Sequence, residues 1–297
     1  MPSHPHMQQL IELAFAEDLG RGLVAVQMQG DHTSASSIPA EVWNSAGFMM
    51  KESCVLSGLE VARRVFAFGA PEAEFEALAR DGDAVGAGDI VARVKGPGRS
   101  LLTCERIALN FMQRMSGIAT NTARAVQALE GTKTRVLDTR KTTPGLRAFE
   151  KLAVLHGGGV NHRMGLYDAI MIKDNHVDYA GSLRAAVENA AAYIDQHDLG
   201  IDLIVEVRDL TEVEEALCCT GIRRLLLDNF SPALTGQAVE LIGGRIETES
   251  SGGLTPDNIR PYAEAGVDFV SLGFITHSAR NMDISLLSDK ALKSRHA

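Results

Sequence analysis

Basic side chains are concentrated in one stretch of this chain, residues 138–176. Six Lys and Arg residues outnumber four acids there, whereas the whole chain has 29 Lys and Arg against 38 Asp and Glu. The six are Arg140, Lys141, Arg147, Lys151, Arg163 and Lys173. Guanidinium and ammonium groups set among glycines offer dense hydrogen-bond donors to phosphate or carboxylate oxygens. The stretch therefore predicts a pocket for a small substrate with several negative charges.

The elements that position these groups form a repeating pattern from Thr134 onward. Short apolar runs alternate with helical segments, which is typical of βα units with a parallel sheet. The six candidate strands are TRVLD, AIMIK, LIVEV, RLLLD, RIETES and FVSLG. In or just after them come Asp138, Arg140 and Lys141, then Lys173 and Asp174, Glu206, Asp228, Ser251 to Gly253, and Gly273. Because loops at the carboxyl ends of parallel strands gather around the ligand, these positions indicate one site.

Two glycine-containing motifs flank this site. SSGGLTPDNI, residues 250–259, joins a strand to a helix, with Pro256 near the first helical turn, and its glycines let backbone N–H groups approach a monophosphate. The alternative is an ordinary tight turn. HGGG, residues 156–159, has no accompanying G-x-S-x-G nucleophile and no dinucleotide-binding spacing. We interpret its glycines as backbone freedom that brings His162 and Arg163 into the pocket.

Each of three charged residues at the strand ends has two possible interpretations. Lys173 is a candidate for a Schiff-base lysine, but its basic surroundings favour a clamp for anions. Glu206 and Asp228, on strands consecutive in sequence, suit Mg²⁺ held jointly with substrate oxygens, because magnesium commonly takes only one or two protein carboxylates. The alternative is that the two carboxylates simply neutralise the basic cluster.

Residues 100–129 predict a long helix in which three polar residues recur every four positions and share one face: Arg106, Asn110 and Arg114. The plain interpretation is a solvated stripe. The functional hypothesis is that Arg106 reaches a ligand, across a subunit interface.

The first 115 residues predict a small α+β domain. A helix over residues 8–19 precedes a long loop that ends at Pro39. Extended chain over residues 47–58 is followed by a helix that stops at Gly69, and residues 82–98 are typical of a hairpin with a strand over 90–94.

Composition excludes several classes of protein. A net charge of -9 argues against sequence-independent binding of nucleic acid. No segment has the ~18 uninterrupted apolar residues of a membrane helix, and the N-terminus shows no export signal. The four cysteines have neither metal-binding spacing nor the density of a disulfide scaffold, which favours buried reduced thiols. We expect a cytoplasmic enzyme with a small-molecule substrate.

With these residues in hand, the chain closely resembles the quinolinate phosphoribosyltransferase family. The similarity covers nearly the whole chain, through IPAEVWNSAGFMMKESCVLSGLEVARRVF, LLTCERIALNFMQRMSGIAT, the block from DTRKTTPGLR to KDNH, VEV, LLLDNF, ESSGGLTPDNI and SLGFITHSA. Motifs of this length and order are highly specific.

The resemblance implies an α/β fold with two domains: an N-terminal α/β sandwich over residues 1–115 and an incomplete α/β barrel, type II phosphoribosyltransferase-like, over residues 116–275. The tail, residues 276–297, is expected to pack back on the first domain. It also implies a homodimer or a larger assembly of dimers, in which the neighbour's N-terminal domain completes each barrel site. The implied enzyme is a pentosyltransferase of NAD biosynthesis that joins quinolinate to 5-phosphoribosyl 1-pyrophosphate with Mg²⁺, giving nicotinate mononucleotide, pyrophosphate and CO₂.

Residue roles carry over by position. The resemblance implies that the two pyridine carboxylates are held by Arg106 (from the partner), Arg140, His162, Arg163 and Lys173. It assigns pyrophosphate to Lys141, the ribose and Mg²⁺ to Glu206 and Asp228, and the 5-phosphate to Ser251, Gly252, Gly253 and Gly273. Thr139, Leu272 and Phe274 complete the predicted substrate-binding set. The predicted catalytic residues are Lys141, Lys173, Glu206 and Asp228.

The chain departs from the family pattern at three places. Residues 21–29, RGLVAVQMQ, are an apparent insertion in the N-terminal loop. Phe274 stands where a small residue is common, which leaves the contacts of residues 272–274 open, and Leu152 replaces an aromatic residue. Two alternatives to the main hypothesis remain: a related protein of molybdenum-transport operons and a catalytically silent anion-binding homologue. Intact Glu206 and Asp228 count against the silent protein, and the dense clamp that includes Arg106 favours quinolinate.

Overall fold

The structure, a computed structural model, describes residues 5–294, and the contacts within it divide the chain into two units. The first unit contains the chain up to Thr120, then Pro144–Gly158, and the chain from Ala279 onward. The second contains Asn121–Thr143 and Gly159–Ser278. The first unit therefore takes in residues 144–158, although they lie between two barrel strands in the sequence.

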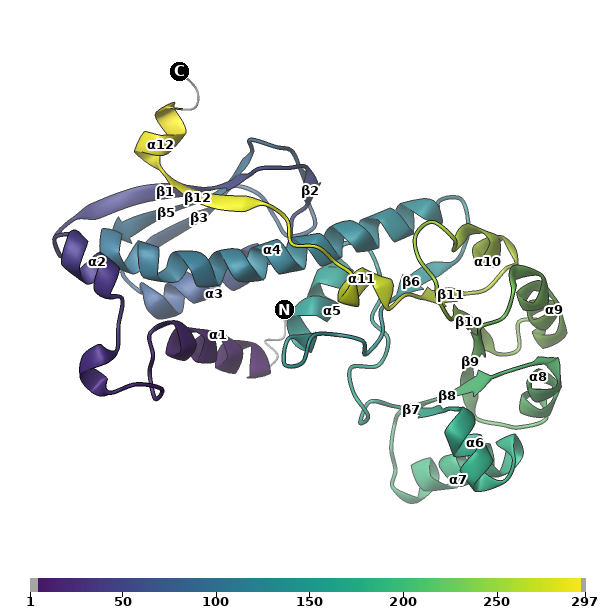
Figure 1. The fold of residues 1–297 in the computed structure, drawn as a ribbon. Coiled ribbons are helices and arrows are strands. Elements are labelled where there is room, and N and C mark those ends of the chain that lie inside the picture. Colours follow the sequence, from purple (N-terminus) through teal and green to yellow (C-terminus); the bar gives the residue numbers. More distant parts are fainter. Residues whose placement is uncertain (1–4, 295–297) are drawn as a thin grey trace. The chain divides into compact units, whose positions relative to one another are not determined.

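The sheet of the first unit has the order β12-β1-β5-β3 and is antiparallel. Its centre is formed by β1 (Trp43–Met50) and β5 (Ile90–Pro97), flanked by β12 (Ile284–Ser288) and β3 (Glu74–Ala77). Side chains of β1 and β5 enter the core, where Phe48, Phe66 and Phe75 meet with ring centroids 5.8–6.1 Å apart. β12, which comes late in the sequence, thus lies beside β1, as Figure 1 shows.

Helices cover this sheet and one another within the first unit. They are α1 (Pro5–Asp18), α2 (His32–Ser37), α3 (Leu59–Gly69), the first part of α4 (Gly98–Ala128), α5 (Arg147–His156) and α12 (Asp289–Ser294). Phe15 of α1 contacts Phe68 of α3 at 5.2 Å between ring centroids, and Phe111 of α4 contacts Phe149 of α5 at 4.6 Å. The aromatic contact between α4 and α5 helps to hold α5 in this unit.

Gly117 in α4 allows the returning chain to pass close to the helix. A Cβ at this position would collide with the carbonyl group of Arg280, so only glycine fits without a backbone shift. Met282 N–H then donates to the Gln113 carbonyl at 3.0 Å, which guides the chain into β12.

The second unit is a six-stranded parallel sheet of order β6-β11-β10-β9-β8-β7. Its strands are β6 (Arg135–Leu137), β7 (Ala169–Ile172), β8 (Asp202–Val207), β9 (Ile222–Asp228), β10 (Glu247–Ser251) and β11 (Phe269–Ser271). The six strands expected from the apolar runs are therefore confirmed. The chain beside β6 adds a parallel bridge between Leu137 and Val160.

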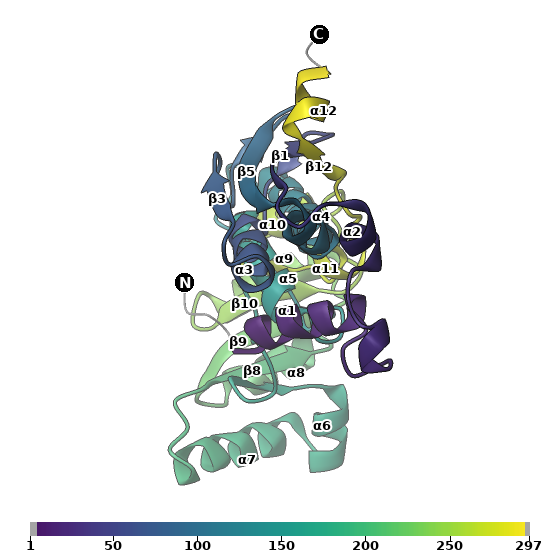
Figure 2. The same cartoon turned by 90° about the vertical axis from the view of Figure 1, so that its left-hand side faces the viewer.

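Helices connect the successive strands of the second unit, and the last of these helices follows the final strand, β11. They are α6 (Asp174–Ala180), α7 (Leu183–Gln196), α8 (Leu210–Leu217), α9 (Pro232–Ile242), α10 (Arg260–Glu264) and α11 (Phe274–His277). α7 contacts β7 and β8, and it lies below β8 in both views (Figures 1 and 2). Connections of this kind are the βα units of an α/β barrel-like domain.

Several local predictions need correction. The expected loop between residue 19 and Pro39 is not only loop, because α2 begins after Asp31, whose carboxylate accepts the Ser34 N–H at 2.9 Å. Residues 82–98 do not form a hairpin: β4 (Ala84–Val85) pairs with β2 (Cys54–Val55), whereas β5 pairs with β1 and β3. Pro256 precedes rather than opens the next helix, which begins at Arg260.

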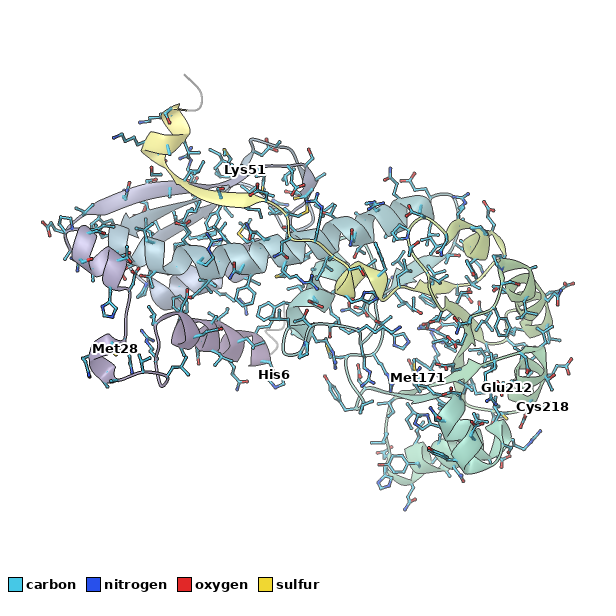
Figure 3. The ribbon with its side chains drawn as sticks, in the orientation of Figure 1. His6, Met28, Lys51, Met171, Glu212 and Cys218 are labelled. Carbon is cyan, nitrogen blue, oxygen red and sulfur yellow. The ribbon has the colours of Figure 1, made fainter. Side chains whose placement is uncertain are left out.

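The apparent insertion, residues 21–29, carries a short 3-10 helix (Val26–Met28) with no buried residue. Met28, labelled in Figure 3, is 62% exposed. Of the cysteines, Cys54 and Cys104 are buried free thiols as expected, but Cys218 is exposed and Cys219 is partly exposed, so the expectation holds for only two. Within residues 5–294, every helix is too short or too polar to cross a membrane.

Candidate active site

A pocket of about 440 Å³ opens at the carboxyl ends of the second unit's strands. Eleven predicted site residues line it: Thr139, Arg140, Lys141, His162, Arg163, Lys173, Glu206, Asp228, Ser251, Gly252 and Gly253. Leu272, Gly273 and Phe274 are not among its lining residues, and neither is Arg106, which lies exposed on α4 in the first unit. Residues that the sequence analysis did not single out complete the wall: Met171, Leu226, Asn229, Glu249 and Ser271.

The register of the parallel strands explains why these side chains converge. Glu206 of β8 pairs with Leu226 of β9, which pairs with Glu249 of β10. One step of two residues further along, Asp228 pairs with Ser251. Because side chains alternate between faces with period two, all of these residues point to the same side of the sheet. Lower on this face, Ala169, Ile204 and Leu226 close the pocket with a buried apolar cluster against Met171.

The cationic side chains of the pocket come from the chain that follows β6 and from the end of β7. Arg163 donates from Nη1 to the Ala169 carbonyl at 3.0 Å, which anchors its guanidinium beside β7. Burial and then repulsion by Arg140 lower the pKa of Arg163 from its ordinary value, opposed by the charge of Asp168. A guanidinium whose charge is destabilised by burial and by a second guanidinium favours an anionic ligand beside it.

Lys173 lies at the end of β7 and forms an ion pair with the neighbouring strand. Its Nζ lies 2.6 Å from Glu206 Oε2, and the side chains of Lys173 and Glu206 are 44% and 9% exposed. The pair supports in part the interpretation that carboxylates neutralise the basic cluster. It also holds the ammonium group in the pocket, within reach of a ligand.

The carboxylates fit a shared metal site but not one built by the protein alone. Glu206 and Asp228 come from neighbouring strands, and Asp228 accepts from its neighbour Asn229 at 2.7 Å. Within residues 5–294, no group of three or more His, Cys, Asp or Glu residues is placed to hold a metal ion. Two carboxylates suffice for Mg²⁺ only where substrate oxygens and water supply its other ligands.

The turn after β10 lies beside the turn after β9. Gly252 has φ +105°, and a Cβ on it would collide with the side chain of Asn229. The Asn229 N–H donates to the Ser251 carbonyl at 2.9 Å and so joins the two turns. Glycine at 252 is therefore required both by backbone conformation and by space.

Helix α11 holds the loop that carries Lys141. Thr276 Oγ1 donates to the Lys141 carbonyl at 2.9 Å. A Cβ on Gly273 would lie 2.9 Å from Cδ of Lys141, so Gly273 gives the lysine its space without lining the pocket. Phe274 is the first residue of α11 and is partly exposed.

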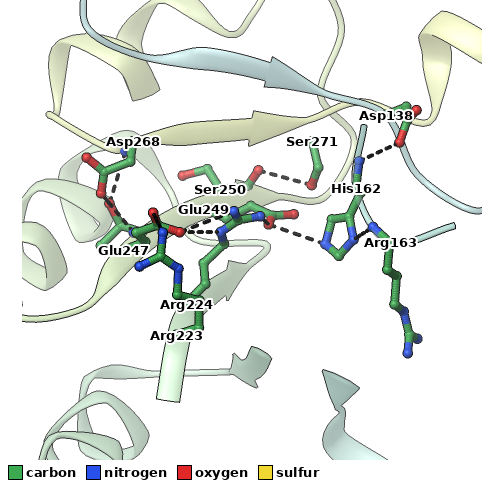
Figure 4. A network of polar contacts seen from close by, with 11 residues as sticks. Asp138, His162, Arg163, Arg223, Arg224, Glu247, Glu249, Ser250, Asp268 and Ser271 are labelled. Atoms are coloured by element: carbon green, nitrogen blue, oxygen red, sulfur yellow. Dashed lines mark hydrogen bonds and ion pairs between the residues drawn. The ribbon is translucent and has the colours of Figure 1, made fainter. Parts of the chain in front are cut away.

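A buried polar network underlies the cations (Figure 4). His162 N–H donates to Asp138 Oδ1 at 2.8 Å, and its ring faces Glu249, with Nε2 3.4 Å from Oε2. The same carboxylate oxygen lies 3.1 Å from Nη1 of Arg224. Alternation along RIETES places Glu249 on the same face as Ser251, which is the sequence signal that could have found it.

Of the three polar residues predicted to share a face of α4, Arg114 is committed within the first unit. It donates to Glu150 Oε1 at 2.9 and 3.0 Å and to the Ala279 carbonyl at 2.8 Å. Arg106 and Asn110 are exposed. The stripe is therefore not uniform, because one of its members is structural.

Comparison with known proteins gives a consistent result over both units. Residues 31–116 match the model of the N-terminal domain of quinolinate phosphoribosyl transferase, and residues 118–287 match that of its C-terminal domain. The chain is 41% identical to nicotinate-nucleotide pyrophosphorylase (carboxylating), chloroplastic, of Arabidopsis thaliana, covering 98% of this chain and 86% of that protein. It is 37% identical to the probable nicotinate-nucleotide pyrophosphorylase (carboxylating) of Bacillus subtilis (strain 168), covering 96% and 94%.

A solved structure is similar along nearly its whole length. The crystal structure of NadC from Streptococcus pyogenes matches with a TM-score of 0.87 at 40% identity, covering 94% of this chain and 95% of that chain.

Proposed function

The chain belongs to the quinolinate phosphoribosyltransferase family, and we propose that the pocket at its strand ends is where it carries out the reaction of that family. The enzyme transfers the phosphoribosyl group of 5-phosphoribosyl 1-pyrophosphate to quinolinate, with decarboxylation, in NAD biosynthesis. The products are nicotinate mononucleotide, pyrophosphate and CO₂.

The observation that carries this assignment to the pocket is the pair of guanidinium groups of Arg140 and Arg163 in its wall. Burial and then repulsion from Arg140 lower the pKa of Arg163. A bound dianion would therefore stabilise the positive charge of this guanidinium. Quinolinate carries two adjacent carboxylates, whereas nicotinate carries one. A site with this charge therefore favours quinolinate.

The chemistry needs alignment and charge stabilisation more than a covalent nucleophile. The pyridine nitrogen forms a bond to the anomeric carbon while the bond from that carbon to pyrophosphate breaks. Arg140, Arg163 and Lys173 hold the carboxylates, Lys141 draws off charge from the leaving pyrophosphate, and the turn at Ser251 to Gly253 receives the 5-phosphate. Glu206 and Asp228 would hold Mg²⁺ jointly with the substrate, and the ion would supply further neutralisation of the pyrophosphate charge.

Decarboxylation follows from the same cations. When the 2-carboxylate leaves as CO₂, the electron pair of its bond remains on the ring carbon until a proton replaces it. Arg140 and Arg163, close enough to repel each other, stabilise that charge along with the positive pyridinium nitrogen. The step consumes one proton, taken from water, and needs no oxidant or reductant.

Purified protein with phosphoribosyl pyrophosphate and Mg²⁺ is expected to consume quinolinate and release nicotinate mononucleotide and CO₂ in equal amounts. Nicotinate, tested in parallel, is expected to turn over roughly 30- to 150-fold more slowly, because it lacks one charge-assisted contact of roughly 2–3 kcal/mol. Nucleotide formation and CO₂ are measured directly. Failure of folded protein to convert quinolinate would reject the function, and equal turnover of nicotinate would reject the proposed role of the second carboxylate.

We further propose a cytoplasmic homodimer, or an assembly of such dimers, in which Arg106 enters the neighbour's site. Arg106 is exposed on α4 and is outside the set of residues that line its own chain's pocket. An exposed arginine next to an interface suits carboxylate recognition in trans.

Mixing two inactive variants tests this arrangement. Arg106→Ala and Arg163→Ala are each expected to lose activity, whereas subunits mixed under exchanging conditions are expected to recover about a quarter of it, because half of the dimers are mixed and one of their two sites has both arginines. Activity is measured before and after exchange, with Arg163→Ala and Arg140→Ala as the mixed control, since both of these residues line one pocket. Recovery no greater than in the control would show that Arg106 does not act in trans.

A further inference from the structure

Glu249 is a carboxylate without a role in the scheme above, although it lies in the wall of the pocket. Its side chain is 0% exposed, and it lies on the inner face of β10 between Leu226 and Phe269 in register. A buried carboxylate is costly unless opposite charge and hydrogen bonds compensate for the lost solvent. Its partners therefore indicate what it does.

Two groups face the same oxygen of Glu249 from opposite sides. Arg224 Nη1 lies 3.1 Å from Oε2, and the Arg224 guanidinium also lies 4.0 Å from the centroid of the Phe269 ring. His162 Nε2 lies 3.4 Å from Oε2. Burial raises the pKa of Glu249, but His162 and Arg224 outweigh burial and hold that pKa below its ordinary value. Glu249 is thus a carboxylate anion with an arginine on one side and an imidazole on the other.

The other nitrogen of the imidazole determines the tautomer. The backbone N–H of Arg163 donates to His162 Nδ1 at 2.6 Å, so Nδ1 is unprotonated and the ring proton is on Nε2, facing Glu249. The imidazole is 6% exposed. Both ring nitrogens therefore face protein groups, while His162 also lines the pocket, and its direct contact with a carboxylate stays a prediction.

From this geometry we propose that Glu249 is a positioning residue for quinolinate: through His162 it fixes the backbone of Arg163 and thereby the guanidinium that binds the substrate's carboxylate. The proposal rests on the proposed function of the pocket. The chain of contacts runs from Arg224 and Glu249 through the imidazole to the Arg163 N–H. Contacts of the length seen between His162 and Glu249 commonly shorten when a substrate binds.

The backbone of the loop that carries Arg163 is anchored at His162, Met164 and Gly165, and the imidazole of His162 accepts the N–H of Arg163 itself. His162 N–H is bound to Asp138, and the N–H groups of Met164 and Gly165 donate to Asp168 at 2.6 and 2.8 Å. Arg163 N–H has His162 Nδ1 as its acceptor. If the imidazole turns, the backbone of Arg163 loses that acceptor while the rest of the loop stays anchored.

The kinetic test uses Glu249→Gln, which keeps the shape and removes the charge. The variant is expected to raise KM for quinolinate by about tenfold or more with KM for phosphoribosyl pyrophosphate within about twofold of wild type, since only the carboxylate end is displaced. The matched control is Ser250→Ala, the next residue of β10, whose buried hydroxyl has no hydrogen-bond partner within residues 5–294. The control is expected to behave as wild type. Equal rises in both KM values, or no rise, would overturn the proposal.

A double-mutant cycle tests whether the effect passes through Arg163. In an Arg163→Lys background, Glu249→Gln is expected to change kcat/KM for quinolinate far less than it does in the wild type, because the group that it positions is already altered. Effects that multiply independently would show that Glu249 acts by another route.

A spectroscopic measurement decides the underlying geometry without turnover. Nitrogen-15 NMR of protein labelled at histidine is expected to show His162 protonated at Nε2, with its signals identified by their loss in His162→Gln. The opposite tautomer would contradict the proposal even if Glu249→Gln is unfolded. If wild-type protein converts no quinolinate, the proposed function fails, whereas this measurement still reports on Glu249.

Discussion

Replacing Arg163 by alanine is expected to lower kcat/KM for quinolinate by about 10³-fold, which corresponds to about 4 kcal/mol of lost transition-state stabilisation. A charge-assisted hydrogen bond contributes about 1.5–3 kcal/mol, and a guanidinium can form two with one carboxylate. The same group is proposed to stabilise the ring charge after CO₂ leaves, so kcat is expected to fall together with substrate affinity. Steady-state kinetics and calorimetric titration with quinolinate measure the two effects.

The free protein is expected to tolerate this change. Arg163→Ala loses the hydrogen bond to the Ala169 carbonyl but also removes the repulsion with Arg140 that contributes to the lowered pKa of Arg163. The midpoint of thermal unfolding is therefore expected to stay close to wild type. Arg184→Ala is the matched control, because Arg184 lies on α7 with a half-exposed side chain and a loose 4.0 Å pair with Glu188. Near-normal turnover by Arg163→Ala would reject the assignment of this clamp.

The barrel strands were predictable from sequence because both faces of a parallel sheet are buried. Runs such as LIVEV and RLLLD have no solvent face, and a polar residue in or just after such a run marks the ligand end. Lys173, Glu206 and Asp228 were found in this way. The structure brings all three into one pocket.

Glu249 was not predicted as a site residue, because it lies within its strand, two residues before the strand ends, and not at the end itself. A charge inside a short run such as RIETES resembles the exposed residue of an edge strand unless its partner is known. Arg224, which neutralises Glu249, is 25 positions away in sequence and lies on the neighbouring strand. Period-two alternation gives the face of a side chain but not whether a buried opposite charge awaits it there.

The predicted hairpin failed for a related reason. Gly86 and Gly88 do form a turn, in which Gly88 has φ +93°, but the strand that follows is long and apolar on alternate residues. Its best partner is β1, whose register with β5 runs from Trp43 opposite Pro97 to Met49 opposite Ile90. Local turn chemistry specifies a reversal, whereas pairing is decided by the larger area of apolar surface that β1 and β5 bury together.

Neither strand patterns nor turn residues predict which unit contains residues 144–158. The contacts group these residues with the first unit. The spacing of Phe149, Ala153 and Val154 indicates one buried face of a helix and no more. The face meets α4 through Phe111 and Phe149, and Glu150 accepts from Arg114 at the same contact. Such a long-range ion pair is invisible in a single sequence.

Glu206→Gln is expected to affect the two substrates in opposite directions. The change removes a negative charge that lies 2.6 Å from Lys173 and within the pocket that contains Arg140 and Arg163. Quinolinate alone is therefore expected to bind as tightly as to wild type or more tightly, because the clamp becomes more positive. Turnover is expected to fall by about 10²-fold and the Mg²⁺ concentration for half-maximal rate to rise, because one of two carboxylates proposed for ribose and metal is lost.

Measuring binding and turnover on the same preparation separates this prediction from general damage to the pocket. Glu188→Gln is the control, since Glu188 is exposed on α7 and its removal leaves the charges of the pocket unchanged. Parallel loss of quinolinate binding and turnover in Glu206→Gln would show that this carboxylate mainly organises Lys173 within the clamp. Undiminished turnover would remove Glu206 from the catalytic set. We expect quinolinate binding to be retained while the use of phosphoribosyl pyrophosphate and Mg²⁺ is impaired. This pattern follows only if the cations after β6 and β7 bind quinolinate and the two carboxylates on β8 and β9 serve the other substrate and the metal.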